Sequence, residues 1–174
     1  MDTLEAIHTR RSIRKYTDRL VPRELVNELL RAAMCAPSAV NAQTWVFIVI
    51  DDRKLLDEIP TYSPYAAMCR GAPLAILVCA DTILEKAPGF WVQDCSAATQ
   101  NLLLTAHALG LGAVWTGIYP MEDRVEGFRK AFGLPEHVIP LALVPIGYPA
   151  QQPGLQDRYR EEKVYHNMYS QSKE

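Results

Sequence analysis

A short basic stretch near the start of the chain, Arg10–Tyr16 (RRSIRKY), contains the residue types that could most directly do chemistry. It places four cations and one hydroxyl within seven residues, directly after a predicted amphipathic helix. Arginine keeps its charge and binds phosphate oxygens through paired N–H groups, so three guanidiniums and a serine hydroxyl can hold an anion. The same cations could instead complement the carbonyl end of the helix dipole in water. A surface for nucleic acid is the third alternative.

The charge of the whole chain helps to choose among these alternatives. The 174 residues carry a net charge of −2 with a pI near 6.1, which argues against nucleic acid or an anionic membrane as the main partner. The composition, 49% hydrophobic and 22% charged, is that of an ordinary globular domain. No leader and no apolar run long enough to cross a bilayer is visible. We therefore expect a small anion in a defined site of a cytoplasmic protein.

A second candidate segment, Ala36–Thr44, joins a predicted helix to a predicted strand. Its small residues would let a flat ligand lie against the backbone, and Asn41 and Gln43 each offer a donor and an acceptor. A plain connection rich in turn formers explains the same composition. The segment alone leaves both interpretations open.

Several other kinds of site have no support in the sequence. The four cysteines, Cys35, Cys69, Cys79 and Cys95, lie far apart without a CxxC pair, which predicts no zinc site and no disulfide framework. The four histidines show no spacing typical of metal ligands. Neither GxGxxG nor GxxxxGK[ST] occurs, so no motif supports dinucleotide or P-loop binding.

Helical and strand patterns alternate along the chain and predict a mixed α/β domain with helical covers. The expected helices are a short one after Asp2, then 22–36, 90–109 and 121–132, and the expected strands are 45–50, 74–80, 112–116 and 139–148. The segment 51–59 could be a polar connection or a helix.

Three of these elements carry more specific expectations. The uninterrupted apolar run 74–80 predicts a buried, central strand. Pro140 and Pro145 remove two ladder donors, so strand 139–148 should lie at an edge or be bulged. The helix 90–109 is small and apolar nearly all round, which favours packing against a second subunit as well as against its own sheet.

The order and separation of four segments resemble the FMN-dependent nitroreductase family over nearly the whole chain. These segments are Arg10–Tyr16, Ala36–Trp45, Trp115–Gly117 and Arg158–Arg160. The resemblance implies an α+β fold with a central, mainly antiparallel sheet flanked by helices. It also implies an intertwined homodimer with two FMN molecules at the subunit interface. Residues 1–174 would form one domain, whose extension 150–174 reaches toward the partner.

The resemblance also implies how the FMN phosphate is bound. Arg10 and Ser12 would hold the phosphate together with Arg158 and Arg160 from the C-terminal extension. Arg11 would contact the phosphate or the ribityl chain.

Residues around the isoalloxazine ring follow from the same resemblance. Arg14 would lie beside N1 and the C2 carbonyl, where a fixed positive charge raises the reduction potential. The partner subunit would contribute Pro37, Ser38, Ala39 and Asn41 around the ring, and Gln43 would be a further ring contact. The ring edge would be lined by Trp115, Thr116 and Gly117, with the Gly117 amide facing N5.

The implied activity is an FMN-dependent oxidoreductase with a ping-pong cycle. NADH or NADPH would give hydride to the flavin, which passes it to a small acceptor such as a nitroaromatic or a quinone. Residues 61–89 hold no long helical insertion, which leaves the acceptor pocket open. One alternative is an FMN-binding protein with a different flavin reaction or a sensor role. Another is a protein without flavin whose arginines bind a different phosphorylated ligand.

Overall fold

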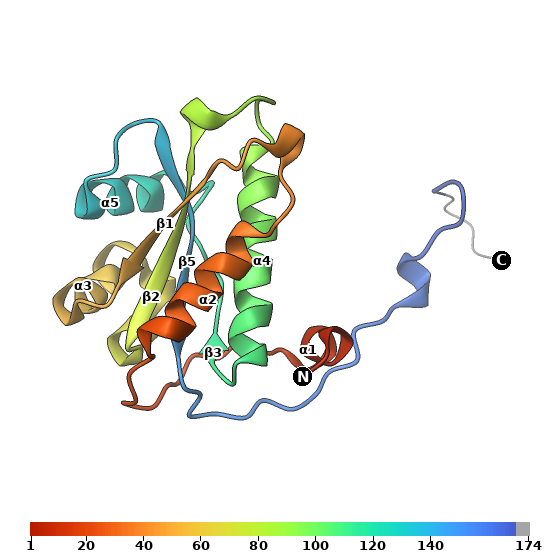
Figure 1. Cartoon of the computed structure of the whole chain (residues 1–174), viewed down its shortest axis with the longest axis horizontal. Coiled ribbons are helices and arrows are strands. Elements are labelled where there is room, and N and C mark those ends of the chain that lie inside the picture. The colour runs from red at the N-terminus through yellow and green to blue at the C-terminus, as the bar shows by residue number, and fades with distance from the viewer. Residues whose placement is uncertain (170–174) are drawn as a thin grey trace.

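The structure, a computed structural model, describes residues 1–169 (Figure 1). Its helices are α1 (Thr3–Thr9), α2 (Arg23–Met34), α3 (Arg53–Tyr62), α4 (Trp91–Ala108) and α5 (Glu122–Phe132). Its strands are β1 (Trp45–Ile50), β2 (Leu74–Asp81), β3 (Gly112–Ala113), β4 (Thr116–Gly117) and β5 (Val138–Gly147).

The strands form one sheet in the order β1-β2-β5-β3, with β4 also paired to β5, and these ladders are antiparallel. The predicted α+β class with an antiparallel sheet is therefore confirmed. The central position expected for strand 74–80 is confirmed too, because β2 lies between β1 and β5. The expected strand 112–116 is instead divided into β3 and β4, which pair with different parts of β5.

The prolines of β5 produce a bulge and do not mark an edge. β5 has β2 on one side and β3 and β4 on the other, so the edge alternative is wrong. The register shifts where Val78 pairs with Ala142 but Cys79 pairs with Pro140, which leaves Leu141 as the extra residue. A bulge accommodates the missing donor of Pro140 while the strand stays internal.

Helices cover both faces of the sheet (Figure 1). Alternate residues of β2 explain this arrangement, because successive side chains of a strand point to opposite faces. Leu74, Ile76, Val78 and Ala80 pack in the cluster with α2 and α4, whereas Ala75, Leu77 and Cys79 pack in the cluster with α3 and α5. Both faces are buried, so β2 is apolar from Leu74 to Ala80.

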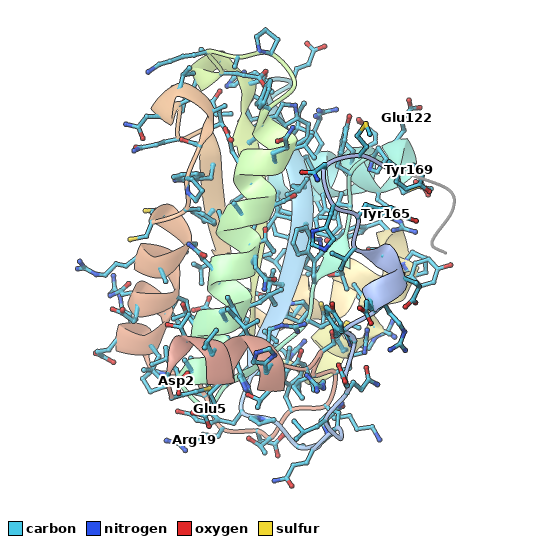
Figure 2. The ribbon with its side chains drawn as sticks, turned by 90° about the vertical axis from the view of Figure 1, so that its right-hand side faces the viewer. Asp2, Glu5, Arg19, Glu122, Tyr165 and Tyr169 are labelled. Carbon is cyan, nitrogen blue, oxygen red and sulfur yellow. The ribbon has the colours of Figure 1, made fainter. Side chains whose placement is uncertain are left out.

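The helix ends follow local capping rules. Asp2 accepts a hydrogen bond from the Glu5 amide and begins α1. Asp52 accepts from the amides of Lys54 and Leu55, so the ambiguous segment after β1 is the helix α3. α1 lies across the C-terminal end of α4, with Asp2 and Glu5 on it (Figure 2).

The C-terminal tail, residues 150–169, extends away from the body after β5 (Figure 1). Its side chains are exposed from residue 152 onward, including large apolar ones such as Leu155, Tyr159 and Met168. Tyr165 and Tyr169 contact each other near its end, with ring centroids 4.4 Å apart (Figure 2). None of the helices in residues 1–169 combines the length and apolar character that a bilayer crossing requires.

Candidate functional site

The basic stretch and the tail meet in one cavity of about 440 Å³. Arg10 and Arg11 line it directly after α1, and Arg158 lines it from the tail together with Asp157. Burial lowers the pKa of Arg10, and the charges of Arg158 and Arg11 lower it further. The cavity therefore concentrates positive charge from two distant parts of the chain, with Asp157 as its one acidic lining residue among those described.

Arg11 connects the start of the tail to the end of α1. Its Nε donates to the Gly154 carbonyl at 3.0 Å, and its Nη1 donates to the carbonyls of His8 (2.9 Å) and Arg10 (2.7 Å). Its Nη2 is buried and has no hydrogen-bond partner. A buried N–H group without an acceptor is costly, so an anion is the chemistry this atom suits.

Backbone pairing fixes the rest of the basic stretch beside the sheet. Ser12 forms a bridge with Ala113, and the Ile13 amide donates to the Ala113 carbonyl at 3.0 Å. The Tyr16 hydroxyl donates to the Ile13 carbonyl at 2.7 Å, and burial raises the pKa of this phenol. The Arg14 side chain is exposed next to this frame. Ser12 and Arg14 are thus held close to the strand segment that continues into β4.

β4 presents its backbone to solvent at Gly117. The Thr116 hydroxyl donates to the Leu143 carbonyl at 2.5 Å and is buried, whereas Gly117 is exposed. A Cβ added at Gly117 would meet nothing within 4 Å. Arg124 Nη1 donates to the Gly117 carbonyl at 3.0 Å. Trp115 packs partly against the core, so Thr116 and Trp115 fix the backbone while Gly117 leaves space beside it.

The loop that precedes β1 is held by a buried carboxylate of α4. Asp94 Oδ1 accepts from the Ala39 amide at 2.9 Å, and Asp94 is 5% exposed. Within the loop, Ser38 Oγ accepts from the Gln43 amide at 3.0 Å, and the Gln43 side chain donates to Asn41 Oδ1 at 2.9 Å. Asn41 and Gln43 therefore form one ordered polar surface.

This loop also has an unusual backbone. Val40, Asn41 and Gln43 have φ values of 48°, 54° and 52°, in the left-handed region that residues other than glycine seldom adopt. Val40, a β-branched residue, is the least suited to it and is 66% exposed. Strain of this kind collects at functional sites, which favours the ligand interpretation of the loop over a plain connection.

The two halves of the predicted site lie at opposite ends of α4. The loop is bonded at Asp94 near the N-terminus, whereas Thr9, just before Arg10, contacts His107 in the last turn. Thirteen residues of helix separate these points by about 20 Å. Within a single chain, the structure brings Arg10, Arg11 and Arg158 together but does not bring the loop residues Pro37–Gln43 to them.

Two further observations concern individual residues. Arg160 is exposed, its Nη1 donates to the Tyr159 carbonyl, and it does not line the cavity with Arg10. Asp94 was not among the residues expected from the sequence. Its signal is a lone carboxylate in the otherwise small and apolar segment 90–109.

A protein-family model named Nitroreductase family matches residues 7–68 and 61–148. The chain belongs to the nitroreductase family. The matched region contains the basic stretch, the loop before β1 and β4. It ends before the tail.

Alignments with similar proteins extend over almost the whole chain. A Methanothermobacter thermautotrophicus protein provisionally named NADH dehydrogenase/NAD(P)H nitroreductase is 61% identical over 165 residues, which are 95% of this chain and 86% of that protein. A crystal structure from Parabacteroides distasonis with the same provisional name has a TM-score of 0.92 and 46% identity, covering 96% and 98% of the two chains. A provisionally named nitroreductase from Desulfovibrio desulfuricans, crystallised in complex with FMN, has a TM-score of 0.83 and 33% identity, covering 98% and 99%.

Proposed function

We propose that the protein is an FMN-dependent oxidoreductase that uses NADH or NADPH to reduce a small acceptor such as a nitroaromatic or a quinone. The chain would act as a homodimer of single-domain subunits with one FMN at each end of the interface. FMN, when bound, supplies the hydride chemistry between the nicotinamide and the acceptor. The protein positions it and sets its electrostatic surroundings.

The cationic cavity at the end of α1 carries this proposal. Three guanidiniums from the two ends of the chain line it, and one of them, that of Arg11, has a buried Nη2 without a partner. A terminal phosphate would supply oxygen acceptors to this N–H group, and its negative charge would offset the repulsion that, after burial, lowers the pKa of Arg10. Ser12, fixed by its bridge to Ala113, adds a hydroxyl on the same segment. The residues present therefore fit the phosphate end of FMN.

The separation of the two half-sites supports a dimer. A second subunit packed antiparallel along α4 would bring its loop Pro37–Gln43 toward the Arg10 end of the first. The outward face of α4 is uncharged, and half of its residues are alanine or serine, which allows close helix packing there. These residues are Gln93, Ser96, Ala97, Gln100, Leu104 and Ala108. The exposed apolar residues of the tail need cover, which the partner would give.

Two residues would set the electrostatic and steric surroundings of the isoalloxazine ring of FMN. Arg14 would place a permanent positive charge at the pyrimidine edge, where electron density collects on reduction. Gly117 would let the backbone approach N5 closely, because no Cβ stands in the open space beside it. No acid, base or nucleophile is required from the chain. The relatives named for NAD(P)H nitroreductase activity support the nicotinamide as reductant.

Flavin binding and turnover test the proposal directly. Purified protein should bind FMN, lose the flavin absorbance on anaerobic addition of NADH or NADPH, and regain it when a nitroaromatic or quinone is added. Protein that takes up no FMN would overturn the proposal. A flavin that is reduced but not reoxidised by any acceptor would favour the sensor role.

The phosphate site is tested by Arg10→Gln. Loss of one charge-assisted contact should weaken FMN binding by about 1.5–3 kcal/mol, while riboflavin, which has no phosphate, should bind as it does to the wild type. Arg31→Gln, on the exposed face of α2, is the matched control and should change neither affinity. Fluorescence titration measures the affinity of the wild type and of each variant for both flavins. Equal weakening of FMN and riboflavin would remove Arg10 from the phosphate.

A further inference from the structure

His107, in the last turn of α4, lies directly behind the cationic cavity. Its Nε2 is 2.7 Å from the Thr9 hydroxyl, and Thr9 immediately precedes Arg10. We propose that FMN binding is linked to protonation of His107, whose imidazole takes up a proton when the phosphate enters the cavity lined by Arg10 and Arg158. This inference rests on the proposed function and adds a titrating residue to the same site.

Hydrogen bonding decides which ring nitrogen titrates. The Thr9 hydroxyl has one proton and lies 2.6 Å from the Glu5 carbonyl, which can only accept. The His107 Nε2 atom must then donate to Thr9, which leaves Nδ1 as the basic nitrogen. Protonation at Nδ1 keeps the Thr9 contact intact, so the ring can change charge without moving.

The His107 imidazole and the cavity proposed for the phosphate lie next to the same residues. A second cavity of about 300 Å³ is lined by His107, Thr9 and Arg11, and both Thr9 and Arg11 also line the cationic cavity. Arg11 thus contacts both the cavity beside the imidazole and the cavity in which the phosphate would bind. A change of charge on the imidazole therefore alters the electrostatic potential at the bound anion, and the anion alters the potential at the imidazole.

The groups that face His107 are mostly cationic. Arg10 and Arg11 follow α1, Glu5 of α1 is the opposing carboxylate, and Met1 lines the same 300 Å³ cavity. Burial lowers the pKa of His107, Arg10 and Arg11 lower it further, and Glu5 raises it. The other elements around the ring contribute uncharged residues only, namely Ile13, Gly110, Leu111, Pro149, Gln151, Gln152 and Pro153.

The sign of the effect follows from these charges. A phosphate dianion offsets the field of the two arginines, so the pKa of His107 rises on binding. Between the free and bound pKa values, each FMN that binds brings a proton with it, and affinity rises as the pH falls through this window. Each unit by which the pKa rises on binding corresponds to about tenfold in affinity across this window.

Titration calorimetry of the flavin-free, full-length protein with FMN tests this linkage. At pH 6.5, the heats in two buffers of different ionisation enthalpy give the number of protons taken up. His107→Gln should take up fewer protons per FMN than the wild type. His137→Gln, whose backbone contacts Thr82 at the other end of the molecule, should match the wild type. The comparison cancels the proton that the FMN phosphate itself releases.

Riboflavin and a spectroscopic titration complete the test. Riboflavin should bind with no difference in proton uptake between the wild type and His107→Gln. In the wild type, the NMR titration midpoint of the His107 ring should move to higher pH when FMN is added, and this measurement needs no variant. Equal proton uptake with FMN in the wild type and His107→Gln, or an unmoved midpoint, overturns the inference while FMN binding stands. Absence of FMN binding instead overturns the proposed function.

Discussion

Two glycines near the site differ in the space that surrounds them. A Cβ at Gly112 would lie 2.5 Å from Ile13 Cγ2, so this glycine lets the basic stretch pack on β3. A Cβ at Gly117 would meet nothing within 4 Å, and its φ is not in the left-handed region. The fold of the chain requires the first glycine, whereas any requirement for the second must come from a ligand or a partner.

Alanine at these two positions should separate stability from binding. Gly112→Ala should lower the free energy of unfolding by about 1–3 kcal/mol through overpacking against Ile13. Gly117→Ala should leave the unfolding of the flavin-free protein unchanged and weaken FMN binding. Gly71→Ala, also in open space and outside the candidate site, is the control. Chemical denaturation and FMN titration measure both effects, and a destabilised Gly117→Ala would contradict the assignment.

Three buried thiols make stability depend on alkaline pH. Burial raises the pKa of Cys69, Cys79 and Cys95 from 9.0 to about 12. In the folded state these thiols stay protonated, whereas in the unfolded chain they ionise above pH 9.0. The stability that these protonated thiols contribute is therefore fully present below pH 9 and is lost as the pH rises toward 12.

Each such thiol should lower the free energy of unfolding by up to ~1.4 kcal/mol per pH unit in this range. Urea unfolding at pH 8, 9 and 10 measures the slope. Cys79→Ala should reduce the slope, even though the lost side chain lowers stability at every pH. Cys35→Ala, at an exposed position, should keep the wild-type slope. A Cys79→Ala slope equal to the wild type would refute the linkage.

At the scale of elements, α4 and the loop before β1 depend on each other through Asp94. One buried carboxylate oxygen accepts from the Ala39 amide, in a loop with three left-handed residues. The loop has little apolar burial of its own, since Val40 and Asn41 are exposed. Hydrogen bonds within the loop order it locally, and the charge-assisted bond from the Ala39 amide to Asp94 holds it against α4.

Asp94→Ala should free this loop and weaken FMN binding by about 1.5–3 kcal/mol. Asp94→Asn keeps an oxygen acceptor for the Ala39 amide and should retain most of the affinity. Hydrogen exchange should rise at residues 38–43 in the alanine variant and stay low in β2. Unchanged exchange in that loop would show that other contacts hold it.

At the scale of the whole molecule, the tail has a surface that does not suit a free segment. Leu155 and Tyr159 are 77% and 68% exposed, and Arg158 reaches back to the cavity beside Arg10. Arg11 fixes only its beginning, through the Gly154 carbonyl. We infer that the part beyond Gly154 completes its contacts on the partner subunit.

A chain ending at Ala150 should therefore lose both dimer stability and FMN affinity. Arg158→Gln in the full chain is the matched variant, and it should stay dimeric while binding FMN more weakly than the wild type. Light scattering gives the mass and fluorescence gives the flavin affinity. A truncated chain that is still a tight dimer with full FMN affinity would remove this role from the tail.

The sequence predicted the class of the fold and the central strand. The family resemblance implied that Arg158 and Arg160 meet Arg10, and the structure brings Arg158 but not Arg160 to the cavity that Arg10 lines. Hydrophobic periodicity and capping residues predict helices and strands directly, whereas the meeting of the distant arginines was implied only by the family resemblance. The sequence left strand 139–148 between an edge and a bulge, because a missing donor alone does not reveal how many neighbours a strand has. The contacts of Asp94 and His107 were also missed, since each depends on which distant segment packs against α4.

The frame of the basic stretch is made by its main chain. Ser12 and Ile13 pair with Ala113 through backbone atoms, and Tyr16 reaches the Ile13 carbonyl. Among the described residues, the side chains of Arg10 and Arg14 take no part in this pairing. Evolution could thus exchange the charges at these two positions without disturbing the scaffold, and redesign for a differently charged cofactor could begin there.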